Sequence, residues 1–233
     1  MLLNLLLLFS CHFDYDEDFN TFDMQLYDIR TFNVGYEKSK KSSVMIEAYN
    51  AQNIFSGHGS GNYFYSGPRK FIITANHVVE REGTIFVKEQ DGTRHKAEVI
   101  YQEASRDVAI LYVHGDLKVT TPVHLHYMHP FNNEGKNIYF TSCPDGTPFV
   151  LGTGVIVKDD DGFFYSQSLA WPGSSGAIAF DARGNVVGVL TGVRIAYDSV
   201  ANSGRMLENY VFIGRFEFID RWKIKRIFQD AGI

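Results

Sequence analysis

Three residues of this chain have the types and the order needed for acyl-transfer chemistry. His77 ends the string Thr-Ala-Asn-His, Asp107 directly precedes an apolar run, and Ser175 lies in the string Gly-Ser-Ser-Gly. A serine hydroxyl is a poor nucleophile until a neutral imidazole removes its proton, and a carboxylate must hold that imidazole in the correct tautomer. His, Asp and Ser in this chain order match one of the known orders of a catalytic triad.

The turn around Ser175 adds a second chemical feature. A serine held between glycines on a sharp turn is exposed, and the backbone N–H groups around it converge. We therefore predict that the amides of Gly173 and Ser175 form an oxyanion site. The Gly-Ser string alone is weak evidence, because such turns also join ordinary hairpins. Isolated His77 and Asp107 also have ordinary structural interpretations, so the prediction depends on all three residues together.

Short strands and turns must position these residues. Apolar, aromatic and β-branched runs predict strands, and turn-forming pairs separate them. The predicted strands cover 44–48, 62–66, 70–74, 84–88, 95–101, 108–113, 137–142, 149–157, 163–166, 177–180, 186–190 and 209–216. Apolar positions at helical spacing predict a C-terminal amphipathic helix over 217–231, packed on the second half of the domain. The polar segment 196–203 is expected to be a loop.

The three motifs resemble the trypsin/chymotrypsin-like serine proteases, in particular the disulfide-free bacterial and viral branch that includes HtrA-type protease domains. The matching strings are Thr74-Ala75-Asn76-His77, Asp107-Val108-Ala109-Ile110-Leu111, Gly173-Ser174-Ser175-Gly176-Ala177 and Gly188-Val189-Leu190-Thr191-Gly192. The resemblance spans about residue 44 to the C-terminus. It implies an all-β fold, a chymotrypsin-like double six-stranded β-barrel with a C-terminal helix. It also implies a serine endopeptidase that needs no cofactor.

The chain departs from that family in a few places. Ala177 stands where the family usually has a glycine after the Ser-Gly pair. No paired cysteines flank His77 or Ser175, and no site for zymogen-style activation is evident. No second domain such as a PDZ module is expected within the 233 residues.

Composition narrows the class of protein further. With 45% hydrophobic residues, 19 Phe and 13 Tyr, the chain can bury a sizeable β-rich core. The formal charge of −5 and the lack of a basic stripe argue against nucleic-acid binding. Two cysteines, Cys11 and Cys143, cannot make a disulfide framework.

The first 43 residues are expected to form a separate unit. The apolar run at 1–9 is too short to span a bilayer, and with Ser10-Cys11 it has the look of a lipoprotein cleavage box, although packing on the domain or a partner is favoured. Residues 14–28 form an acidic, aromatic arm, either solvated or docked to a larger assembly. The polar stretch 38–43 is expected to be an exposed boundary. Residues 44–233 then form the protease domain, with barrels at about 44–120 and 121–218.

A substrate pocket is implied by the resemblance. It would be lined by residues before the serine turn and by the later strand, which are Leu169, Ala170, Leu190, Thr191, Gly192 and Val193. None is acidic, and none in 190–193 is a histidine. We therefore expect a small or aliphatic residue before the scissile bond, rather than Lys, Arg or Glu.

Other chemically capable residues have plainer interpretations. His58 is expected in a glycine-rich loop over 56–61 as a turn residue, and Asp116 in a turn after a strand. Cys143 is expected to be a structural thiol. The pair His124 and His126, with His129 nearby, has zinc-like spacing but no matching carboxylate or thiol, so no metal is expected.

Two functional classes remain open from sequence. The favoured one is a serine endopeptidase acting on polypeptides, with the cell envelope, secretion or a virus particle as possible locations. The other is a catalytically silent binding or assembly protein of an envelope complex or virus particle, which Ala177 and the acidic arm favour. An esterase with the same triad is disfavoured because the strand–elbow–helix context of α/β-hydrolases is absent.

Overall fold

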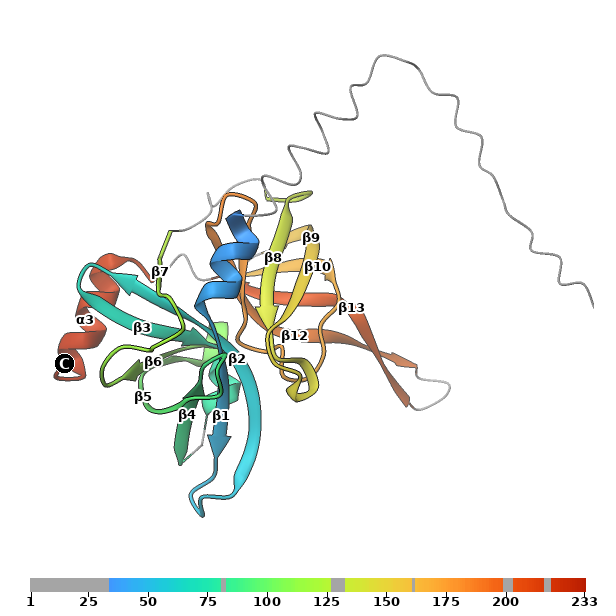
Figure 1. The fold of residues 1–233 in the computed structure, drawn as a ribbon. Coiled ribbons are helices and arrows are strands. Elements are labelled where there is room, and N and C mark those ends of the chain that lie inside the picture. The colour runs from blue at the N-terminus through green and yellow to red at the C-terminus, as the bar shows by residue number, and fades with distance from the viewer. Residues whose placement is uncertain (1–33, 81–82, 127–132, 161, 199–202, 216–218) are drawn as a thin grey trace, which may run out of the picture.

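The protein folds into two β-barrels that lie side by side, with a helix between them at one end and another helix on the outer face of the first barrel (Figure 1). The computed structural model describes residues 34–233 except 81–82, 127–132, 161, 199–202 and 216–218. The apolar N-terminus, the acidic arm and His129 therefore lie outside the described residues. No helix in the described ranges combines the length and the apolar character that crossing a membrane requires.

The first barrel is a six-stranded ring closed by the pairing of β1 with β2. Its strands follow the order β1-β4-β5-β6-β3-β2, and a short β7 adds in parallel to β2. The bounds are β1 Ser43–Tyr49, β2 Phe55–Ser66, β3 Arg69–Thr74, β4 Thr84–Lys88, β5 Arg94–Glu103, β6 Val108–Val113 and β7 Val123–His124. A one-turn helix α2, Asn76–Val79, follows β3, and a 3₁₀ turn η1, Ala104–Arg106, precedes β6.

The second barrel closes in the order β10-β13-β12-β11-β8-β9. Its strands are β8 Asn137–Ser142, β9 Val150–Asp160, β10 Phe163–Ser168, β11 Ile178–Asp181, β12 Val186–Asp198 and β13 Ser203–Arg215. A 3₁₀ turn η2, Pro144–Gly146, joins β8 to β9, and α3, Arg221–Asp230, ends the described chain. The expected double six-stranded barrel with a C-terminal helix is thereby confirmed.

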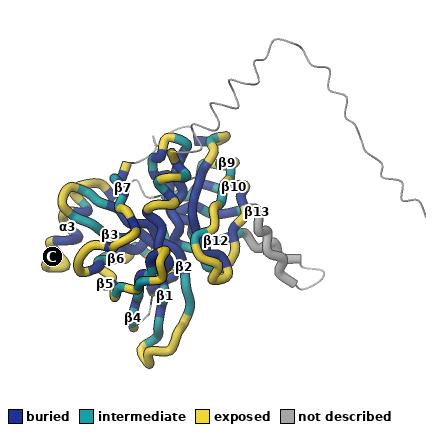
Figure 2. The backbone as a smooth tube through the Cα atoms, viewed as in Figure 1, coloured by how far each residue is buried: buried dark blue, intermediate teal, exposed yellow. Residues whose placement is uncertain are grey.

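Buried residues continue from one barrel into the other, and one hydrophobic cluster contains residues of both (Figure 2). Phe64 of β2 stacks on Phe180 of β11 with ring centroids 6.2 Å apart. The Asn62 side-chain oxygen accepts a hydrogen bond from the Ile178 backbone amide at 3.0 Å. Such contacts fix one barrel against the other, which a site built from both barrels requires.

Two segments that were expected to be loops are paired as strands instead. Residues 56–61 belong to β2 and not to a loop, because they pair with β1 from Ala48↔Gly57 to Val44↔Gly61. The glycines there admit close neighbours: a Cβ at Gly59 would lie 2.7 Å from the Val78 side chain. The hairpin β12–β13 also extends through much of the expected loop 196–203, with pairs up to Asp198↔Ser203.

Helix α3 packs on the first barrel, whereas the second was expected. Its buried face, Ile224, Ile227 and Phe228, belongs to the core of the first barrel. Phe228 meets Phe71 and Tyr112 edge-on at centroid distances of 6.3 and 5.9 Å. Amphipathic periodicity indicates that a helix has an apolar face, but it does not indicate which partner covers that face.

The polar stretch 38–43 is not an exposed break. Residues 34–42 form a helix, and Ser39, Ser42 and Ser43 are buried. Ser39 Oγ donates to Thr141 Oγ1 at 2.8 Å, and Asn62 Nδ2 donates to Ser42 Oγ at 2.8 Å. A serine-rich helix can be buried here because both barrels offer hydrogen-bonding partners for its hydroxyls.

Candidate active site

His77 and Asp107 form a tightly bonded pair at the edge of the first barrel. Helix α2 presents His77, and Asp107 follows η1 in the left-handed region with φ 54°. Asp107 Oδ2 lies 2.7 Å from His77 Nδ1, and Asp107 Oδ1 accepts from the His77 backbone amide at 2.8 Å. The Asn76 amide also donates to the Asp107 carbonyl at 3.1 Å.

The pair has a defined electrostatic consequence. The hydrogen bond to Asp107 raises the pKa of His77 above its ordinary value, against the lowering effect of burial and with further help from the carboxylate charge. Because Nδ1 faces a carboxylate, the ring proton belongs on Nδ1, which leaves Nε2 of the neutral ring free to accept a proton.

Ser175 lies on a tight turn between β10 and β11 that is held from both barrels. The Ala177 amide donates to the Ser174 carbonyl at 3.1 Å, and the Gly176 amide donates to the Leu190 carbonyl at 2.8 Å. The Ser60 amide of β2 donates to the Ser175 carbonyl at 2.8 Å. Gly176 has φ 89°, and a Cβ there would lie 2.1 Å from the Ser60 carbonyl oxygen, so only glycine fits.

The structure brings the serine turn to the His77 helix across strand β2. A Cβ at Gly59 would lie 2.7 Å from Val78, the neighbour of His77, and 3.0 Å from the Ser175 carbonyl oxygen. Over the described part of the chain the His77 ring bonds only to Asp107, and the Ser175 hydroxyl makes no hydrogen bond. Catalytic hydrogen bonds of this kind are often long in an unliganded enzyme and tighten with substrate.

The amides of Gly173 and Ser175 are both available to a ligand. The peptide bonds of the described residues are trans, so each N–H points opposite to the carbonyl of the preceding residue. The Pro172 carbonyl accepts from the Asp145 amide at 2.7 Å, and the Ser174 carbonyl accepts from Ala177. Neither the Gly173 nor the Ser175 amide has an acceptor among the residues described.

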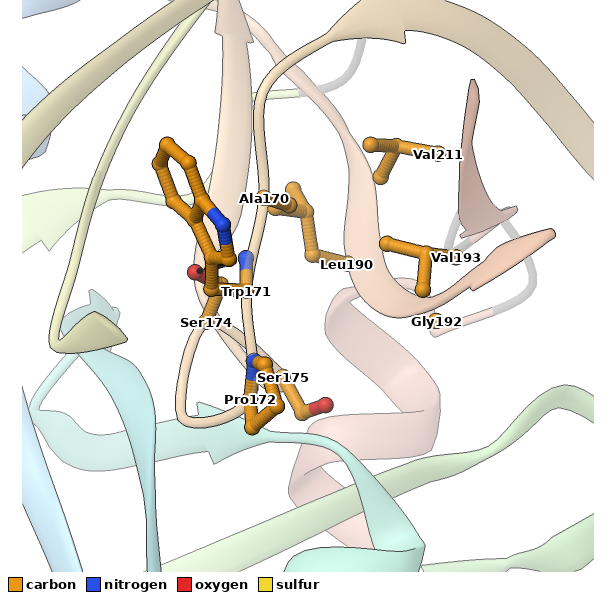
Figure 3. A pocket seen from close by; sticks show the side chains of 9 residues that line it. All are labelled: Ala170, Trp171, Pro172, Ser174, Ser175, Leu190, Gly192, Val193 and Val211. Carbon is orange, nitrogen blue, oxygen red and sulfur yellow. Dashed lines mark hydrogen bonds between the residues drawn. The ribbon is translucent and has the colours of Figure 1, made fainter. Parts of the chain in front are cut away.

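A small apolar cavity of about 100 Å³ adjoins Ser175 (Figure 3). It is lined by Ala170, Trp171, Pro172, Ser174, Ser175, Leu190, Gly192, Val193 and Val211, all uncharged. Four of the six residues expected at a substrate pocket line it, while Leu169 and Thr191 do not.

These two residues have other surroundings. Thr191 Oγ1 instead donates to the Phe212 carbonyl at 3.3 Å, and Leu169 lines a neighbouring cavity with Trp171. Sequence reasoning missed Trp171, Pro172, Ser174 and Val211. Val211 enters because it is the pairing partner of Val193, a register that sequence patterning alone did not reveal.

Ala177, the departure noted in the sequence, is fully buried in the core of the second barrel. Its methyl group therefore packs with core residues such as Ala179 and Leu190. The backbone hydrogen bonds of the serine turn are formed on both sides of Ala177.

The other candidate residues lie in structural contacts. Asp116 accepts from Lys70 at 2.6 Å on the surface, and Cys143 is buried, which raises the pKa of its thiol. The His124 and His126 rings lie 4.0 Å apart between centroids. Among the described residues, no group of three or more His, Cys, Asp and Glu could hold a metal ion.

His58 is more than a turn residue. It lies in β2, half-buried, and its ring contacts the η2 turn that follows β8. Sequence reasoning gave no reason to connect these two segments, which are far apart in the chain.

The two-barrel architecture is the chymotrypsin-like fold, and solved structures share it. A serine endoprotease from Yersinia pestis aligns with a TM-score of 0.65 and 17% identity, over 86% of this chain and 67% of that structure. The HtrA-type protease AlgW with a tripeptide aligns with a TM-score of 0.66 and 18% identity, over 87% of this chain and 64% of that one.

The sequence comparisons define the family. The trypsin-like peptidase domain family matches residues 59–189, more than half of the chain, and the chain belongs to that family. The resemblance inferred from the three motifs is confirmed.

The curated relatives are longer proteins. A DegP-like periplasmic serine endoprotease of Chlamydia pneumoniae is 28% identical over 146 residues, 57% of this chain and 28% of that protein. The periplasmic serine endoprotease DegP of Salmonella typhimurium is 22% identical over 155 residues, 61% of this chain and 31% of that protein. The chain thus spans less than a third of the length of these two relatives.

Proposed function

We propose that the protein is a serine endopeptidase that cleaves polypeptides through an acyl-enzyme. His77 takes the proton of the Ser175 hydroxyl as the hydroxyl attacks the scissile carbonyl, and later returns it to the leaving amine. Asp107 orients His77 and stabilises its charged form. The amides of Gly173 and Ser175 donate to the developing oxyanion. The family match and the serine endoproteases among the relatives support this reaction class.

The observation that carries the proposal is the pair of hydrogen bonds that the Asp107 carboxylate accepts from His77, one from its backbone amide and one from its ring. Here one oxygen fixes the backbone and the other fixes the ring, so the imidazole is oriented and its tautomer is chosen.

The apolar cavity beside Ser175 suggests the preference for the residue before the scissile bond. Its volume of about 100 Å³ and its uncharged lining suit a small or aliphatic side chain. A charged side chain would lose its hydration there without gaining a partner. Strong cleavage after Lys, Arg or Glu in a peptide library would contradict this preference.

We further propose that the protein works in the cell envelope, since the relatives include periplasmic endoproteases. Within the envelope, the N-terminal arm would attach the protein to a larger assembly, or a lipid on Cys11 would attach it to a membrane. Fractionation of the native host followed by immunodetection distinguishes an envelope protein from one found elsewhere.

Labelling with a fluorophosphonate probe tests the reaction, because the probe reacts only with an activated serine. Wild-type protein should be labelled, and Ser175→Ala should not. Ser174→Ala provides the neighbouring control, since Ser174 Oγ is engaged with Ser142 Oγ at 3.2 Å, and it should still be labelled. Folded wild-type protein that takes no label would instead support the catalytically silent binding protein.

A further inference from the structure

We propose that His58 is a positioning residue that keeps the Gly173 amide directed at the oxyanion. It does so by a hydrogen bond that holds the η2 turn of the second barrel against strand β2 of the first. The inference rests on the proposed function, because it assigns Gly173 to the oxyanion site. It extends the residues that support the active site to one outside the three motifs, and that residue connects the two barrels.

The contact between His58 and η2 is a specific hydrogen bond. The Gly146 amide donates to His58 Nε2 at 2.8 Å. In this bond Nε2 is the acceptor, which requires the tautomer that carries its ring proton on Nδ1. The same Nε2 lies 3.2 Å from the Cys143 carbonyl oxygen, to which it cannot donate while it accepts from the Gly146 amide.

Two successive residues of the turn have positive φ, and one of them is not a glycine. Asp145 has φ 50° and Gly146 has φ 76°, and both values lie in the left-handed region. A non-glycine residue in that region costs free energy and persists only where its surroundings enforce the conformation. The Gly146 N–H belongs to the peptide that follows Asp145, so its bond to His58 fixes the backbone on that side of Asp145.

The turn controls the orientation of the Gly173 amide. The Asp145 amide donates to the Pro172 carbonyl at 2.7 Å. Because the Pro172–Gly173 peptide is trans, this bond fixes the carbonyl on the η2 side and directs the Gly173 N–H to the opposite side. If η2 moved, the peptide plane would lose the bond that sets its direction.

His58 also contacts Gly173 directly. A Cβ at position 173 would lie 2.4 Å from His58 Nε2 and 2.4 Å from the Cys143 carbonyl oxygen. The imidazole therefore lies against the Gly173 α-carbon, with no room for a side chain between them. The same ring touches both the turn that orients the peptide and the peptide itself.

Ser60, two residues further along β2, makes a parallel set of contacts. Ser60 Oγ accepts from the Cys143 amide at 2.9 Å and donates to the Gly173 carbonyl at 2.7 Å. Residues i and i+2 of a strand face the same side, so His58 and Ser60 form one row directed at the second barrel. Ser60 fixes the start of the η2 segment, and His58 fixes its end.

Substitutions at position 58 separate the acceptor from the shape of the ring. His58→Phe keeps a flat ring but removes the acceptor, whereas His58→Gln places an amide oxygen near the position of Nε2. We expect His58→Phe to lower kcat on an aliphatic peptide substrate at least about tenfold with KM changed less than about twofold, because the lost interaction is made in the transition state. His58→Gln should recover most of kcat. His114→Phe, at an exposed histidine bonded to Glu98, is the matched control and should behave as wild type.

Amide hydrogen exchange provides a readout independent of turnover. In His58→Phe the Asp145 and Gly146 amides should exchange at least about tenfold faster, while the β1–β4 amides keep their protection. Unchanged exchange at these two amides, or a His58→Phe kcat within twofold of wild type, would contradict the proposal that His58 positions the η2 turn and the Gly173 amide. Failure of the proposed function has a different signature, namely a wild-type protein that takes no fluorophosphonate label. In that case the exchange measurement still decides whether His58 holds the turn.

Discussion

Asp107 binds His77 at two points: one carboxylate oxygen accepts from the backbone amide at 2.8 Å, and the other lies 2.7 Å from ring Nδ1. Asp107 itself is held in the left-handed region at φ 54° by the end of η1. The carboxylate therefore approaches His77 from a fixed backbone, and the ring cannot rotate without breaking a bond.

This geometry predicts the effect of Asp107→Asn. The amide can still accept from the His77 backbone, but its NH₂ group facing Nδ1 favours the wrong imidazole tautomer. We expect kcat to fall about 10⁴-fold with little change in KM. Steady-state kinetics on a peptide substrate measure both values. Asp116→Asn, at a surface carboxylate bonded to Lys70, is the control and should stay within twofold of wild type.

The pH dependence of kcat/KM follows from the raised pKa of His77. The ring must be neutral to accept the serine proton, so activity is lost as pH falls through that pKa. The acidic limb of the profile should therefore lie above 6.5, the ordinary value of histidine. In Asp107→Asn the limb of the residual activity should move to lower pH, because the hydrogen bond that raises the pKa most is gone. A wild-type limb below 6.5 would contradict the raised pKa of His77.

The cavity beside Ser175 can be narrowed without disturbing the fold. A Cβ at Gly192 would meet nothing within 4 Å, and the position has no positive φ. Gly192→Val should reduce kcat/KM for substrates with Leu before the scissile bond at least about tenfold more than for substrates with Ala. Fluorophosphonate labelling of the same variant should persist, because Ser175 and His77 are unchanged. Equal losses for both substrates would place the specificity pocket elsewhere.

Glu89 predicts how stability depends on pH. Its carboxylate is fully buried and accepts from the backbone amides of Lys118, Val119 and Thr120, with His95 as a fourth partner. Burial alone would raise the pKa of Glu89, but these hydrogen bonds outweigh it and hold the pKa at about 2. The stabilisation is therefore present above the pKa of an unfolded glutamate, and is lost as pH falls through that of the folded protein.

Glu89→Gln should remove this contribution. We expect the free energy of unfolding to fall by about 1–3 kcal/mol at pH 7, because buried amides lose a charged acceptor. Urea denaturation at several pH values measures it, and the difference between variant and wild type should shrink below about pH 4. Glu98→Gln, at an exposed carboxylate, is the control and should change stability by less than about 0.5 kcal/mol. A difference that stays constant down to pH 2 would contradict the account.

Local patterns in the sequence predicted most of the strands and the three motifs, because short segments determine these features. Alternating apolar residues located most strands, and the strings around His77, Asp107 and Ser175 carried enough information to identify the family, because each places a chemical group on a short, defined turn. The triad roles themselves stay a prediction, although the bonds between His77 and Asp107 have the geometry that those roles require.

Tertiary structure decided what depends on contacts between distant segments. The sequence did not indicate that α3 covers the first barrel, that the serines at 39 and 42 are buried between the barrels, or that Val211 lines the cavity. Nor did it connect His58 with Gly146 and Gly173. The physical reason is that a residue's local pattern specifies which side of an element is apolar or polar, whereas its partner is specified only when the whole chain is packed.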